Sequence, residues 1–192
     1  LDVYQEAYED VPQPRDLRWR IEHAQHLHPE DIARFAEIGV VAAMQPIHCT
    51  SDGPWVPVRL GEERSRTGAY VWRDLFSTGA VIASGTDVPV EPVDPLPSFH
   101  AAVTRQMADG TAFYPDQVMT RMEALYARTL GAAYAAFEED IKGSLEVGKL
   151  ADVTVFSRDI LAVEAAEILE TEVVYTIVGG EVRYQAREIT ER

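Results

Sequence analysis

The chain has 192 residues, of which 32 are acidic and 17 are basic, giving a formal net charge of −15. This excess of acidic groups would repel phosphates, and no apolar run approaches the roughly 20 residues that span a bilayer, so we expect neither nucleic acid nor a membrane as a partner. The single cysteine, Cys49, cannot form an internal disulfide, which agrees with a reducing cytoplasm as the expected location.

The first predicted element is a helix over residues 1–9. Leu1, Tyr4 and Tyr8 fall on one face of such a helix, and the prolines within residues 11–14 would end it. The chain has no initiating methionine and starts directly in this helix. We therefore expect a fragment of a longer protein, with a processed or tag-cleaved end as the alternative.

Three β/α units follow. Alternating or apolar segments predict strands over residues 17–23, 40–45 and 80–84. Helical spacing predicts helices over residues 28–38 and 69–77. Residues 47–66 are rich in Gly and Pro and predict a long functional loop. Strands that alternate with helices indicate a parallel sheet of the α/β class, either doubly wound or part of a (β/α)8 TIM-type barrel.

The segment after the third strand is predicted to be a loop followed by two helices. Residues 88–97 contain four prolines, so they predict an extended loop rather than a central strand. A helix is predicted over residues 97–107. Another begins at Thr120, where Thr120 and Glu123 form the pattern of a capping box.

The composition changes after Phe137, and the rest of the chain is predicted to be rich in strands. The expected elements are a strand within residues 143–156, a short helix over 163–169 and a hairpin of residues 173–178 and 181–184. The Gly-Gly pair between the hairpin strands suits a two-residue turn. We therefore divide the chain into residues 1–140, which carry the β/α units, and a β-rich tail of residues 141–192.

Two residues of metal-ligating type stand at the ends of predicted parallel strands. His23 ends the first strand, and Asp87 follows the third strand after a turn of small residues. Functional groups in α/β folds gather at the carboxyl ends of the strands, and imidazole and carboxylate both bind divalent metals. The spacing indicates a metal site, with a hydrogen-bonded core histidine and a turn-forming aspartate as the alternatives.

The exit of the second strand carries two further polar candidates. Gln45 and His48 are predicted to bind substrate, with strand termination and contact with solvent as the alternatives. Glu22 is expected to point away from His23, into the layer between the sheet and the helices, because strand side chains alternate. A carboxylate buried there needs a partner such as Arg20 or Arg73.

Four short motifs together resemble one known family. They are IEHAQ at residues 21–25, MQP at 44–46, GTDVPV at 85–90 and GSLEVGKLAD at 143–152. In this order they resemble the C-terminal half of the amidohydrolase superfamily, and specifically the amidohydrolase family 3 group that includes N-substituted formamide deformylase-like proteins. The resemblance covers nearly the whole chain.

The resemblance implies a metal-dependent hydrolase of a small-molecule substrate, acting on carbon–nitrogen bonds of the amide type. It also implies a (β/α)8 barrel, of which this chain holds the sixth to eighth strands, and a small β-sandwich to which the tail belongs. By resemblance His23 is the metal ligand of the sixth strand. Asp87 is the aspartate of the eighth strand, which binds the metal, expected to be zinc, and acts as the general base.

The sequence departs from the family pattern in ways that bear on activity. The paired histidines of the family's first strand, the bridging residue of its fourth strand and the histidine of its fifth strand are all absent. A zinc site usually has three protein ligands, whereas this chain supplies two. We therefore expect the parent protein to be a hydrolase and this chain alone to be inactive. The alternative is a non-catalytic fragment or assembly module that keeps the fold without a metal.

A partial barrel would also leave its inner surface exposed to solvent. Ile21, Val41, Ala43 and Ile82 are expected to line that surface, and the outer strands would have unpaired edges. We therefore expect the chain to self-associate, as a homo-oligomer that covers this apolar surface.

Overall fold

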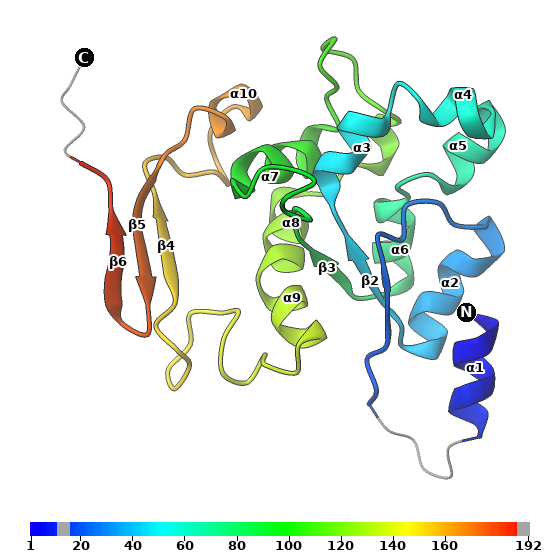
Figure 1. Ribbon diagram of the computed structural model, residues 1–192, viewed down its shortest axis with the longest axis horizontal. Coiled ribbons are helices and arrows are strands. Elements are labelled where there is room, and N and C mark those ends of the chain that lie inside the picture. Colours follow the sequence, from blue (N-terminus) through cyan, green and yellow to red (C-terminus); the bar gives the residue numbers. More distant parts are fainter. Residues whose placement is uncertain (11–15, 188–192) are drawn as a thin grey trace.

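The computed structural model describes residues 1–10 and 16–187. It contains two separate three-stranded sheets, with helices packed against and between them (Figure 1). The first sheet is parallel and runs β1 (Arg20–Glu22), β2 (Val41–Met44), β3 (Ile82–Ser84). The second is antiparallel and runs β4 (Val153–Phe156), β5 (Val173–Val178), β6 (Glu181–Gln185). The α/β class predicted from the sequence is therefore confirmed.

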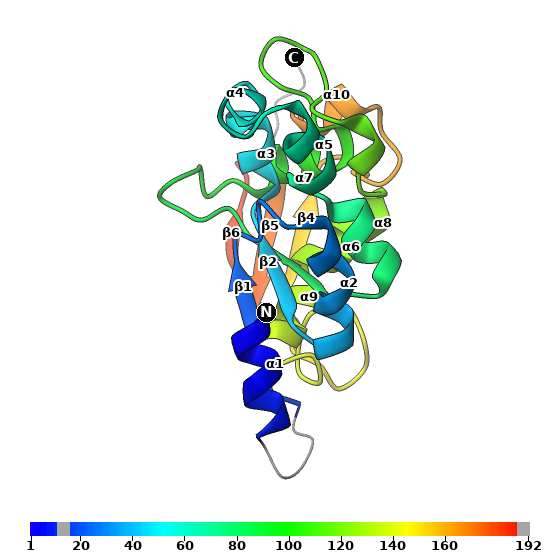
Figure 2. The same cartoon turned by 90° about the vertical axis from the view of Figure 1, so that its right-hand side faces the viewer.

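Helices and one 3-10 turn connect and flank the strands. They are α1 (Asp2–Glu9), α2 (Pro29–Ile38), α3 (Pro46–Asp52), α4 (Val56–Leu60), α5 (Glu62–Gly68), α6 (Trp72–Thr78), α7 (Pro95–Thr104), a 3-10 turn η1 (Pro115–Gln117), α8 (Arg121–Arg128), α9 (Leu130–Ala135) and α10 (Ala165–Ile168). Figure 2 shows α2 and α6 together on one side of the parallel sheet. Among the described residues, no helix has the length and apolarity needed to cross a membrane.

The first helix and first strand are close to their predicted positions. Tyr4 and Tyr8 of α1 both pack on Trp19, with ring centroids 5.1 and 4.9 Å apart. The predicted end of this helix, residues 11–14, lies outside the described residues. The strand is shorter than predicted, because Arg18 and His23 have left-handed φ angles of 44° and 68° that are incompatible with continued strand pairing.

The prediction that an apolar surface of the sheet lies open to solvent is wrong. Ile21 and Ile82 pair with the same residue of β2 and face the helices, where both contact the main core. Val41 and Ala43 lie on the opposite face, but they too are buried. The reason is that α9 lies against β3, and Ala135 of α9 forms one buried cluster with Val41 and Ala83.

The predicted burial of Glu22 is also wrong. Glu22 shares its sheet face with Ala43, its partner in the register, and its side chain is exposed to solvent. There it forms an ion pair with Arg20 at 2.7 Å, so the first of its two suggested partners is confirmed. Arg73 instead forms an ion pair with Glu123 at 2.6 Å.

Residues 47–66 form three short helices rather than the predicted loop. Proline stands in the first turn of α3 and α4, and two glutamates stand in the first turn of α5, as is typical of helix starts. The next helix, α6, begins at Trp72 rather than at residue 69. Helix α7 begins two residues earlier than predicted, because the Asp94 side chain accepts a hydrogen bond from Leu96 N.

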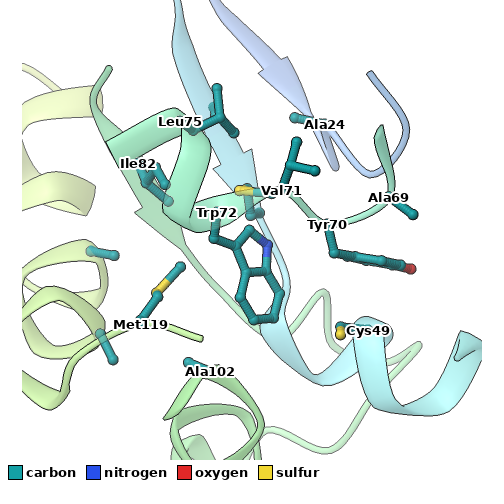
Figure 3. Packing of buried hydrophobic residues seen from close by; sticks show 14 of the residues in the cluster. Ala24, Cys49, Ala69, Tyr70, Val71, Trp72, Leu75, Ile82, Ala102 and Met119 are labelled. Carbon is teal, nitrogen blue, oxygen red and sulfur yellow. The ribbon is translucent and has the colours of Figure 1, made fainter. Parts of the chain in front are cut away.

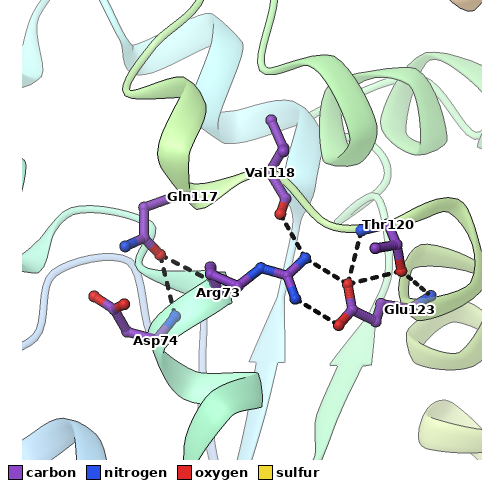
Figure 4. A network of polar contacts seen from close by, with 6 residues as sticks. All are labelled: Arg73, Asp74, Gln117, Val118, Thr120 and Glu123. Atoms are coloured by element: carbon purple, nitrogen blue, oxygen red, sulfur yellow. Dashed lines mark hydrogen bonds and ion pairs between the residues drawn. The ribbon is translucent and has the colours of Figure 1, made fainter.

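A large buried aromatic residue and a polar network hold α6 in place. Trp72 lies at the centre of the core (Figure 3). Arg73 donates to both carboxylate oxygens of Glu123 and to the Val118 carbonyl (Figure 4). The same glutamate completes the predicted capping box with Thr120, so one carboxylate both starts α8 and attaches it to α6.

The tail forms its own sheet but shares the main core. The predicted hairpin is present, and Asp152 Oδ1 accepts from Gly179 N in its turn at 2.8 Å. Ile160 and Ile168 are buried in the same cluster as the parallel sheet. Arg121 of α8 donates to the Ile160 carbonyl at 2.6 Å. The second sheet is therefore tied to the helices by side chains that precede and follow β4.

Candidate functional site

Three side chains converge at the carboxyl ends of the parallel strands. His23 directly follows β1, His48 lies in the first turn of α3 after β2, and Asp87 comes three residues after β3. The rings of His23 and His48 are stacked with centroids 5.8 Å apart, and His23 Nε2 lies 3.9 Å from Asp87 Oδ2. One ligand atom from each residue lies within 4.8 Å of the other two.

The backbone turns sharply where two of these residues stand. His23 has a φ angle of 68° and Asp87 one of 61°, both in the left-handed region that residues other than glycine seldom adopt. The turn at His23 comes directly after β1, and the turn at Asp87 comes three residues after β3. Strained backbone of this kind is common at functional sites, where the surrounding structure maintains it.

Gln45 contacts His23, one of the candidate metal ligands. Its Oε1 lies 2.9 Å from His23 Nδ1, and Gln45 is buried. When this oxygen accepts a hydrogen bond, the His23 proton is on Nδ1 and the lone pair of Nε2 faces Asp87. Histidine ligands are commonly oriented in this way by a second polar group.

The arrangement fits a divalent cation. Zinc binds histidine nitrogen and carboxylate oxygen at about 2.1 Å, so two ligand atoms on one ion lie less than about 4.2 Å apart. The distance from His23 Nε2 to Asp87 Oδ2 is 3.9 Å. A mixed nitrogen and oxygen donor set is also one that divalent metals accept. His23 and Asp87 are therefore able to share one cation.

A second group of polar residues, which the sequence reasoning missed, adjoins His48. Tyr70 donates to Asp52 Oδ2 at 2.7 Å, and Gln25 Nε2 donates to the Tyr70 oxygen at 2.7 Å. The same Gln25 nitrogen lies 3.5 Å from His48 Nδ1. Had residues 46–52 been predicted as a helix, the i, i+4 spacing of His48 and Asp52 would have placed them on one face.

Buried groups hold Tyr70 in this position. Its N–H donates to the Gln25 carbonyl at 2.7 Å, and its carbonyl accepts from Arg105 Nη1 at 2.8 Å. Burial, and then the neighbouring Asp52 carboxylate, raise the pKa of the Tyr70 hydroxyl, so this hydroxyl keeps its proton. Burial also raises the pKa of the nearby Cys49 thiol to about 12, which leaves this cysteine without the thiolate that a nucleophile needs.

Comparison with known proteins supports one family. A family model described as "Amidohydrolase family" matches residues 1–184. Over 185 residues the chain is 38% identical to the protein LONG AFTER FAR-RED 3 of Arabidopsis thaliana, covering 96% of this chain and 31% of that protein. It is 35% identical to the putative amidohydrolase YtcJ of Bacillus subtilis strain 168, covering 93% and 34%. It is 28% identical to N-substituted formamide deformylase of Arthrobacter pascens, covering 96% and 34%.

A solved structure agrees with the sequence comparison. The chain superposes on an uncharacterized metal-dependent hydrolase from Pyrococcus horikoshii OT3 with a TM-score of 0.73 and 32% identity, covering 86% of this chain and 33% of that chain. The chain thus spans about a third of the length of the curated relatives it matches. Since the family model covers nearly all of its residues and the fold agrees, the chain belongs to the amidohydrolase family.

Proposed function

We propose that this chain is part of a metal-dependent hydrolase that cleaves carbon–nitrogen bonds of the amide type in a small molecule. The observation that carries the proposal is the approach of His23 Nε2 to within 3.9 Å of Asp87 Oδ2, with Gln45 orienting the imidazole. The bond type is supported by the 28% identity to N-substituted formamide deformylase. A donor set of nitrogen and oxygen favours zinc as the metal.

In this proposal His23 and Asp87 hold the metal, and Asp87 also moves a proton. When bound, a divalent cation would lower the pKa of a water toward neutrality and polarise a carbonyl. Asp87 then accepts the proton of the attacking water and passes it to the departing nitrogen as a general base and acid. Contact of Gln45 and His48 with substrate stays a prediction, supported by their place beside His23: Gln45 Oε1 lies 2.9 Å from His23 Nδ1, and the His48 ring stacks on the His23 ring.

We also propose that residues 1–140 are the last three β/α units of a (β/α)8 barrel, and that residues 141–192 belong to a small sandwich. The three parallel strands lie side by side in chain order, as consecutive strands of such a barrel do. The tail strands form a separate antiparallel sheet, as a sandwich domain would require.

The isolated chain is proposed to be inactive, because it supplies two proposed metal ligands, whereas a zinc site usually has three protein ligands. The same lack of a third ligand also supports the alternative, a non-catalytic module that keeps the fold without a metal. Self-association and a cytoplasmic location stay predictions. Burial of Val41, Ala43 and Ile82 removes the apolar surface on which the self-association was based.

Zinc binding by the purified chain tests the metal site. Asp87→Asn and His23→Gln should each weaken zinc at least about tenfold in a competition titration, because each removes a ligand. Glu22→Gln is the matched control, since Glu22 adjoins His23 in sequence but forms an ion pair with Arg20. Unchanged zinc affinity in both ligand variants would rule out the proposed site.

A formamide hydrolysis assay with added zinc tests whether the chain is inactive by itself. No turnover above the zinc-only background is expected. Robust turnover that Asp87→Asn abolishes would show that the isolated chain is a complete enzyme.

A further inference from the structure

The polar array formed by Asp52, Tyr70 and Gln25 has its donors and acceptors fixed by chemistry. An ionised carboxylate only accepts hydrogen bonds, so the contact of 2.7 Å between Tyr70 and Asp52 uses the tyrosine proton. The Tyr70 oxygen must therefore accept in its other contact of 2.7 Å, with Gln25. Since only the amide nitrogen of Gln25 can donate, the orientation of this amide is determined.

That orientation in turn decides where His48 carries its proton. The Gln25 nitrogen has two hydrogens, of which one points to Tyr70. The acceptors left for the other are His48 Nδ1 at 3.5 Å and Asp52 Oδ2 at 3.4 Å. A proton on His48 Nδ1 would point at these amide hydrogens, so the neutral ring carries its proton on Nε2. His23 has the opposite tautomer, because its Nδ1 faces the oxygen of Gln45.

The proton on His48 Nε2 points at no acceptor among the described residues. His48 is 7% exposed, and its Nε2 is a buried atom without a hydrogen-bond partner in the described part of the chain. Leaving a buried donor without an acceptor destabilises the fold, because the group has lost its hydrogen bonds to water. The atom belongs to the ring that stacks on His23, so an acceptor held beside the metal ligands would satisfy it.

We propose that Asp52, Tyr70 and Gln25 are positioning residues that keep the proton of His48 on Nε2, making His48 a hydrogen-bond donor to a substrate oxygen and not a metal ligand. The inference rests on the proposed function and deepens it, because hydrolysis of an amide-type bond develops negative charge on the carbonyl oxygen. A fixed N–H donor aimed at such an oxygen typically contributes about 100- to 1,000-fold to kcat. The substrate class is thus one with a carbonyl oxygen next to the bond that breaks.

The tautomer can be observed without metal or substrate. In the 192-residue chain labelled with 15N-histidine and kept metal-free at a pH where the ring is neutral, long-range 1H–15N spectra distinguish protonated from unprotonated ring nitrogens. A His48→Gln variant assigns the signal. We expect the proton on Nε2. A proton on Nδ1 in the unaltered chain would overturn the proposal.

Two substitutions test the array itself. Tyr70→Phe removes the hydroxyl that fixes the Gln25 amide, and Asp52→Asn allows the whole chain of hydrogen bonds to reverse. Either should give a mixture of His48 tautomers or the Nδ1 form. Tyr126→Phe is the matched control, a partly buried tyrosine outside the array. A His48 signal that is unchanged in both array variants would exclude a positioning role.

Zinc titration separates a donor from a ligand. His48→Gln should leave zinc affinity within about threefold, whereas loss of a true ligand such as His23 should cost at least about tenfold. An equal loss in both variants would make His48 a ligand and overturn the proposal. Because the tautomer is measured without metal, failure of zinc binding altogether would count against the proposed function and leave the array's test intact.

Discussion

Single buried side chains determine where the polar groups of this site lie. Arg105 has no exposed surface, and its guanidinium donates to the carbonyls of Phe113 and Tyr70. It also stacks on Trp72, with Cζ 4.4 Å from the ring centroid. Burial lowers the pKa of Arg105, which reflects the cost of keeping a charge away from water. These contacts fix the backbone of Tyr70 and, through it, the array beside His48.

Arg105→Lys is therefore expected to lower the free energy of unfolding by about 2–4 kcal/mol, because an ammonium cannot reach both carbonyls or stack in the same way and remains buried. Urea denaturation followed by circular dichroism would measure it. Arg64→Lys, at an exposed arginine that also bonds a carbonyl, is the matched control and should change stability by less than about 0.5 kcal/mol. Equal effects of the two substitutions would contradict the role assigned to Arg105.

The candidate site could be predicted from the sequence only in part. Asp87 was identifiable because it follows a clear apolar run, and His23 because it ends a segment in which apolar and polar residues alternate. Their mutual approach could be inferred because parallel strands share an edge. The contact between His23 and Gln45 depends on a left-handed turn that no residue type at that position requires. The array around Tyr70 depends on Arg105, which is 35 residues away in the chain, and local patterns carry no information about such contacts.

At the scale of elements, strands and capped helices were predictable and short helices were not. The buried strand β2 reads directly from its apolar run, and α8 from its capping box. Helices α3, α4 and α5 each have at most seven residues, too few to be stable alone. They form because residues such as Cys49, Val56 and Ser65 are buried against the rest of the molecule. That stabilisation comes from tertiary packing, so the local sequence indicated a loop.

The link between α6 and α8 should show in the pH dependence of stability. Hydrogen bonding to Arg73 lowers the pKa of Glu123, so this carboxylate stabilises the fold above its unfolded pKa of about 4.3 and loses that contribution as pH falls through the folded value. Glu123→Gln should cost about 1–2 kcal/mol at pH 7, because an ion pair with two hydrogen bonds is lost.

The cost of Glu123→Gln should shrink toward zero in urea titrations as pH falls below the unfolded pKa and through the lowered folded pKa of Glu123, because below both values the carboxylate is protonated in both states. Glu62→Gln removes the exposed pair with Arg66 and serves as the control. It should cost less than about 0.5 kcal/mol at every pH. A Glu123→Gln cost that stays constant from pH 7 to pH 3 would show that the ion pair is not its source.

At the scale of the whole molecule, the two sheets depend on one core. Helix α10 packs on α7, and Ile168 at its end has no exposed surface. Ile160 and Ile168 join a cluster that also contains Ile82 of the parallel sheet. The hydrophobic contacts therefore run without a break from the parallel sheet to the segments that carry the antiparallel one. We expect both sheets to unfold together, whatever larger assembly the chain belongs to.

Ile168→Ala tests this expectation. Removing the buried side chain should lower the free energy of unfolding by about 2–5 kcal/mol, and amide hydrogen exchange should speed up in β2 and β3 as well as in β5, because one cooperative unit loses its stability everywhere at once. Leu169→Ala alters the adjacent residue, which is 53% exposed, and should have little effect on either sheet. If exchange in Ile168→Ala rises only in β4, β5 and β6, the tail is an independently unfolding unit and the contacts of Ile168 with α7 do not couple the sheets.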